Sequence, residues 1–153
     1  MTVDPAAISA TTALVAVVLS PVVSIYVARR QIRASVVSAN RQAWINQLRE
    51  ALAELVTSLR FLNLRRDGSL ALEEGEWIER YQRAFHLTNK VVLLLNPGES
   101  DHQDLRAAIK QAGELLLDNA GDRGQKLVAT TDRIVAQSQA ILKREWERVK
   151  RGD

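Results

Sequence analysis

The sequence predicts an all-α protein: an N-terminal transmembrane helix that continues into a cytoplasmic antiparallel helical bundle, assembled as an oligomer. Three observations predict it: an uncharged apolar run near the start, apolar residues that recur every three or four positions afterwards, and no segment that alternates at period two. The 153 residues leave room for one small domain beside the apolar run. We divide the chain into 1–28, a tail and transmembrane helix; 29–66, a basic stalk and coiled-coil-like helix; and 67–153, a helical bundle domain.

The first helix is predicted from residues 6–28, which contain no charged side chain. As a helix, this run would be about 34 Å long, against about 30 Å for the hydrocarbon core of a bilayer. Arg29, Arg30 and Arg33 follow the run and no basic residue precedes it. By the positive-inside rule, we expect the N-terminus outside, the body in the cytoplasm, and Tyr26 with the three arginines at the membrane interface.

Small and hydroxylated residues recur along this predicted span. They lie three or four positions apart, at Ser9, Thr12, Ala16, Ser20 and Ser24. In lipid, such a stripe lets helices approach closely, which favours self-association. Around a symmetric bundle the same stripe could line a narrow polar pore, so helix packing and pore lining both stay open.

The second part of the predicted helix carries a coiled-coil seam. Leu48, Leu52, Leu55, Leu59 and Leu62 follow alternating four- and three-residue steps. The helix is expected to stop near residues 66–68, because Gly68 stands where helices commonly end.

Three further helices are predicted, each from an apolar face. The second helix ends at Asn96-Pro97-Gly98, and Ser100 is expected to cap the third. The fourth begins near Gln125. The predicted buried faces are Trp77, Tyr81, Phe85, Thr88, Val92 and Leu95; then Leu105, Ile109, Ala112 and Leu116; then Leu127, Thr131, Ile134, Ser138 and Ile141.

Charge is divided unevenly along the chain. Residues 29–66 hold eight Arg and two Glu, whereas residues 67–124 hold eleven acidic and six basic side chains. The basic residues could attract the acidic helices, contact anionic lipid, or, repeated by oligomer symmetry, hold a phosphorylated ligand. The candidate ligand-binding residues are Arg41, Trp44, Arg49, Arg60, Arg65 and Arg66.

Catalytic and metal-binding patterns are not found. Cysteine is absent, which excludes disulfides, thiolate metal sites and cysteine nucleophiles. His86 and His102 do not have the spacing of a zinc site, and residues 121–126 lack the spacing of a phosphate-binding loop. We therefore expect no metal, no cofactor and no enzymatic activity.

Two segments carry a resemblance to a known group of proteins. Together with the single predicted span, Arg41-Gln42-Ala43-Trp44-Ile45-Asn46-Gln47-Leu48-Arg49 and Lys90-Val91-Val92-Leu93-Leu94-Leu95-Asn96-Pro97 resemble small bacterial membrane proteins. Some of these, such as the effector of the Hailong system, are membrane effectors of antiphage systems paired with a nucleotidyltransferase. The resemblance implies an oligomeric, ligand-gated ion channel whose opening depolarises the inner membrane.

Two functions from different classes follow. The first is a homo-oligomeric effector or channel of the bacterial inner membrane, for instance a tetramer, that depolarises the membrane in antiphage defence. The resemblance implies control by a nucleotide or oligonucleotide from a partner nucleotidyltransferase. The alternative is a membrane-tethered helical scaffold that recruits a cytosolic partner protein. The expected partners of the first are the lipid bilayer, further copies of the chain and that ligand.

Overall fold

Within the residues that the structure describes, the chain forms four helices, one of which is much longer than the others. The computed structural model describes residues 5–66, 68, 73–118 and 120–151, and it describes side chains from Pro21 onward except at positions 22, 33, 34, 65 and 66. The helices are α1 (Pro5–Arg66), α2 (Glu74–Leu94), α3 (Ser100–Leu117) and α4 (Arg123–Arg151). No strand occurs within the described residues, so the predicted all-α class is confirmed for this part of the chain.

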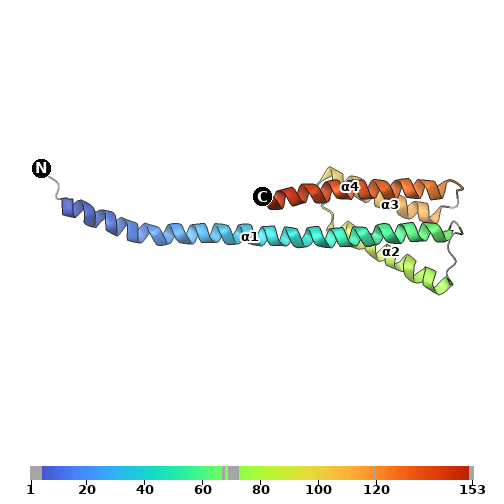
Figure 1. Ribbon diagram of the computed structural model, residues 1–153, viewed down its shortest axis with the longest axis horizontal. Helices are drawn as coiled ribbons and strands as arrows, with labels where there is room; N and C mark the ends of the chain where they lie inside the picture. Colours follow the sequence, from blue (N-terminus) through green and yellow to red (C-terminus); the bar gives the residue numbers. More distant parts are fainter. Residues whose placement is uncertain (1–4, 67, 69–72, 119, 152–153) are drawn as a thin grey trace.

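The helices alternate in direction and form an open bundle. Helix α4 lies along the C-terminal half of α1, α2 packs on the other side of α1, and α3 packs on α4 (Figure 1). The spatial order is therefore α2, α1, α4, α3, with α2 and α3 as the two outer helices. Because these two have little contact with each other, the bundle is open between them.

The core follows the predicted leucine seam of α1. Leu48, Leu52, Leu55, Leu59 and Leu62 are all buried, which confirms the prediction. The predicted faces of the third and fourth helices are also buried throughout. Gly68 has φ 77°, a left-handed conformation that glycine adopts without steric cost, just past the end of α1.

The predicted face of the second helix is right at Leu95, which is buried, and at Trp77 and Tyr81, which are half-buried against the core, but it is wrong at Phe85. The buried residues of the helix are Ala84, Leu87 and Val91, followed by Leu95 at the cap, whereas Phe85 is 64% exposed. Helix α2 packs on a single neighbour, α1, so only a narrow stripe of it is covered. The predicted cap is also wrong: Ser100 is the first helical residue of α3, and Glu99 occupies the N-cap position without a side-chain hydrogen bond to the helix.

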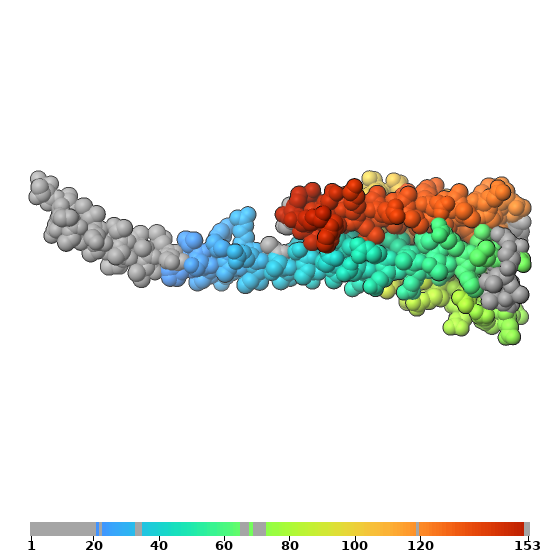
Figure 2. Space-filling model, viewed as in Figure 1, coloured from blue at the N-terminus to red at the C-terminus, as the bar shows by residue number. Residues whose placement is uncertain are grey.

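The N-terminal half of α1 extends beyond the bundle. Figure 2 shows the coloured residues of this part, from Pro21 onward, without cover from α2, α3 or α4. The described residues from Pro21 to Asn40 are exposed, except for Ser38, which is half-buried. We call residues 21–40 the projecting segment.

The predicted location in a membrane is overturned. In the part of the chain that the structure describes, no helix is apolar over enough residues to cross a bilayer. The description as a single-pass inner-membrane protein, N-terminus outside and body cytoplasmic, is therefore corrected.

Candidate functional site

The densest polar cluster joins α1, the start of α3 and the end of α4. Arg144 of α4 donates through Nη1 to Asp101 Oδ2 (2.5 Å), through Nε to Glu145 Oε1 (3.1 Å) and through Nη2 to Glu99. Arg148 Nη1 donates to Glu145 Oε1 (2.6 Å), and Arg41 Nε lies 3.8 Å from Glu145 Oε2. We call these six residues the acid–arginine cluster; they comprise three carboxylates and three guanidinium groups.

Local geometry places each acidic member. Glu99 and Asp101 stand at the first turn of α3, where the helix dipole favours negative charge. Glu145 lies four residues after Ile141, so it continues the buried stripe of α4, and its side chain is only 7% exposed. A carboxylate in that position needs charged hydrogen-bond partners, and Arg144 and Arg148 supply them.

His102 links the cluster to an aromatic contact. Its Nδ1 accepts a hydrogen bond from the backbone N–H of Asn96 (2.8 Å), so the proton of the neutral ring lies on Nε2. The ring stacks on Trp44, with centroids 6.0 Å apart and planes inclined by 7°. Trp44 Nε1 in turn donates to the carbonyl oxygen of Leu94 (2.8 Å). Trp44 and His102 thus fasten the α2–α3 turn to α1.

Three side chains at the start of α3 lie close enough together to serve as metal ligands. Oxygen and nitrogen atoms of Glu99, Asp101 and His102 lie within 4.8 Å of one another. However, the guanidinium of Arg144 already hydrogen-bonds to both carboxylates, and its Nη2 is 3.3 Å from His102 Nε2. The positive charge that the carboxylates require is therefore supplied by arginine, and the cluster fits a structural ion pair better than a metal centre.

Of the proposed ligand-binding residues, Arg41 and Trp44 line one pocket of about 400 Å³ beside the acid–arginine cluster. Arg49 donates to Asn46 (3.1 Å), and Arg60 pairs with Asp132 of α4 (2.9 Å). The side chains of Arg65 and Arg66 lie outside the described residues. The structure therefore brings together two of the six proposed residues, Arg41 and Trp44. In the neighbouring acid–arginine cluster the guanidinium groups and the carboxylates are equal in number. Binding of a nucleotide there stays a prediction.

Of the proposed helix-packing residues, only Ser24 falls among the described side chains, where it is exposed on the projecting segment. Ser9, Thr12, Ala16 and Ser20 lie outside the described side chains. Among the proposed interface residues, Tyr26 is 67% exposed, Arg29 and Arg30 are exposed, and Arg33 is outside. Pore lining and lipid contact both require the membrane location that is corrected above, so neither is proposed further.

A second pocket, of about 760 Å³, lies at the start of α4. It is formed by residues 120–125 with Asn63, Val128, Ala129 and Asp132. Two of its acidic side chains are already paired, Asp122 with Lys126 (2.7 Å) and Asp132 with Arg60. The hydrogen bond from Lys126 lowers the pKa of Asp122 below its ordinary value. The lining also contains Arg123, which is buried, and one guanidinium group alone does not select a ligand class.

The acid–arginine cluster makes stability depend on pH. Burial opposes ionisation of Asp101, but the hydrogen bond from Arg144 prevails and lowers the pKa of Asp101 below the ordinary 3.8. A lowered carboxyl pKa stabilises the fold above the unfolded-state pKa, and this stabilisation is lost as the pH falls through the folded-state pKa. We expect the unfolding temperature of Asp101→Asn to fall less steeply with acidification than that of the wild type.

The control for this measurement is Asp104→Asn, an exposed position on the same helix. Thermal unfolding followed by circular dichroism, from neutral pH to below 3.8, compares the three proteins. If Asp101→Asn and the wild type lose stability in parallel, the ion pair with Arg144 does not carry this pH dependence.

No family model, no curated protein and no solved structure matches the chain. The resemblance to antiphage effectors therefore has no support from these comparisons, and the functional argument rests on the geometry.

Proposed function

We propose that the protein is a self-assembling helical scaffold, in which the bundle is the body and the projecting segment of α1 is the connector to a second copy. The observation that carries the proposal is a helix that continues past its bundle while exposing large apolar side chains. Those between 44% and 67% exposed are Val23, Ile25, Tyr26, Val27, Ile32, Val36 and Val37. Scattered apolar side chains are normal on a surface, but seven on one uncovered helix favour an interaction site.

Energetics support a partner for this segment. A helical segment without tertiary contacts is marginally stable in water, because most of the stability of helices in proteins comes from packing of an apolar face. Burying one Val or Ile side chain completely contributes about 1.5–3 kcal/mol. Covering even a few of the exposed side chains would therefore offset the cost of association.

Charge supports a second copy as the partner. Residues 21–40 include three Arg and no acidic residue. Residues 73–118, which contain α2 and α3, include nine acidic and five basic residues. The chain thus carries both a basic connector and a more acidic surface, and two copies complement each other in charge.

The test is self-association of the full chain and of Val27→Asp, measured by sedimentation equilibrium or light scattering. The aspartate would replace a buried apolar contact by a charge and weaken association at least about tenfold. Gln47→Asp adds the same charge to α1 at an exposed position beside the bundle and should associate as the wild type does. A wild type that stays monomeric at tens of micromolar, or a Val27→Asp variant that associates normally, would refute the proposal.

A further inference from the structure

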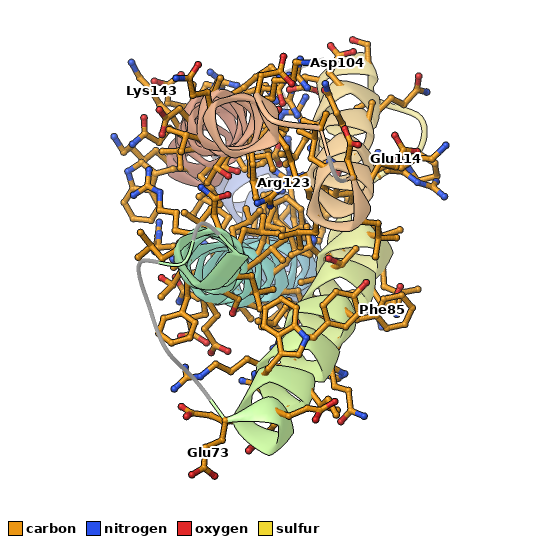
Figure 3. All side chains as sticks on the ribbon, turned by 90° about the vertical axis from the view of Figure 1, so that its right-hand side faces the viewer. Glu73, Phe85, Asp104, Glu114, Arg123 and Lys143 are labelled. Carbon is orange, nitrogen blue, oxygen red and sulfur yellow. The ribbon has the colours of Figure 1, made fainter. Side chains whose placement is uncertain are left out.

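An apolar groove separates the two outer helices of the bundle. It has a volume of about 270 Å³ and is lined by side chains of α1, α2 and α3, which are mostly apolar. They include Leu59, Tyr81, Phe85, Ile109, Leu116 and Leu117. Figure 3 shows α2 diverging from the rest of the bundle. Phe85 of α2 and Glu114 of α3 lie on the same side of the bundle in that view. The groove exists because α2 rests on α1 and α3 rests on α4.

The walls of the groove expose large apolar side chains. Phe85 of α2 is 64% exposed and Leu117 of α3 is 66% exposed. Both side chains line the groove, so apolar surface is exposed there on two of its walls.

Two acidic residues, Glu114 and Asp118, lie near the end of α3 at one end of the groove. Glu114 lines the groove and pairs with Lys110 (3.6 Å), whereas Asp118 is the exposed C-cap residue of α3. The acidic residues at the start of α2 do not belong to this end. Glu79 lines a separate pocket with Arg80 and Arg83, and Figure 3 shows Glu73 at the opposite edge of the view from Glu114.

The projecting segment has a face that fits this groove in spacing and charge. Val23, Val27 and Arg30 are separated by four and three residues, so they lie on one side of α1. That side lies close to the side of the leucine seam, because residues 30, 41 and 52 are eleven residues apart, which is about three turns of a straight α-helix. From Val23 to Arg30 the helix rises about 10 Å, and the α2 wall from Tyr81 to Thr88 also spans about 10 Å.

We infer, building on the proposed self-assembly, that the groove between α2 and α3 receives the Val23–Val27–Arg30 face of another copy. The two valines would cover Phe85 and Leu117, and Arg30 would lie near Glu114 and Asp118 at the end of α3. The contact joins two different surfaces of the same chain, so each copy gives one connector and accepts another. Such a head-to-tail contact forms a ring where the rotation closes and a filament where it does not.

Engineered cysteines test the contact directly, because the chain has no cysteine of its own. Two differently tagged full-length chains are mixed and oxidised, one with Val27→Cys and the other with Phe85→Cys. We expect a disulfide between the two tags to dominate. With Leu93→Cys in place of Phe85→Cys, at a site that is 86% exposed on α2 and does not line the groove, the yield should fall several-fold. Dominance of the Val27–Val27 product would overturn the inference, and so would equal yields from Phe85→Cys and Leu93→Cys.

Complementation separates this inference from the proposed function. Phe85→Asp retains the connector and loses the groove, and Val27→Asp does the reverse, so each alone should be monomeric. An equal mixture contains one intact pair of surfaces and should stop at a dimer. Because Phe85 is exposed in one copy, the aspartate should leave the circular dichroism spectrum unchanged. If the wild type and Phe85→Asp assemble equally while Val27→Asp does not, self-assembly holds and the groove is excluded; a monomeric wild type excludes both.

Discussion

Replacing Glu145 by alanine is expected to destabilise the bundle by about 2–3 kcal/mol. The side chain is 7% exposed and accepts hydrogen bonds from Arg144 and Arg148, with Arg41 nearby. Its removal would leave three guanidinium groups close together and without their central carboxylate. The expected loss is below that of a fully buried pair, because Arg144 and Arg148 are about one third exposed and water compensates in part.

Urea unfolding of Glu145→Ala, Glu145→Gln and Glu147→Ala measures this effect. Glu147 is exposed on the same helix, so its removal should change the free energy of unfolding by less than about 0.5 kcal/mol. Glutamine keeps the shape and one acceptor oxygen, and we expect an intermediate loss. Equal losses for the two alanine variants would show that the acid–arginine cluster contributes nothing specific to stability.

Leu55→Ala is expected to cost about 2–5 kcal/mol, the larger of the two stability effects. Leu55 is completely buried in the middle of the α1 seam, so alanine would remove apolar contacts and leave a cavity. Because the domain is small, this loss is a large fraction of its stability.

The matched comparison is Leu93→Ala, where the same atoms are removed from a side chain that is 86% exposed. Thermal and urea unfolding should place Leu93→Ala within about 0.5 kcal/mol of the wild type. If both variants lose the same stability, the seam does not form the core that its burial indicates.

Regular features of the fold could be predicted because they depend on local spacing. The steps from Leu48 to Leu62 allow one buried face on a helix. Gly68 itself adopts the left-handed conformation just past the end of that helix. The face of α2 could not be fixed in this way. Trp77, Tyr81 and Phe85 have helical spacing, but their burial depends on how many helices surround α2, which spacing does not record.

The acid–arginine cluster was missed because its parts are far apart in sequence. Glu99 and Arg144 are separated by 45 residues, and neither stands out in its own segment. One signal was present: Glu145 extends the buried stripe of α4, where a charged side chain requires a partner. The apolar start of the chain led to the membrane assignment, which the described residues do not support.

The connector and the core seam belong to one uninterrupted helix, and this has a mechanical consequence. No hinge lies between the bundle and Pro21, so packing around Leu48 to Leu62 sets the direction of the free end. The projecting segment is about 30 Å long, and a tilt of about 10° at its base would displace its tip by about 5 Å. A small rearrangement between α1 and α4 would therefore cause a larger displacement at the end of the projecting segment. It would reorient the molecule that is bound there.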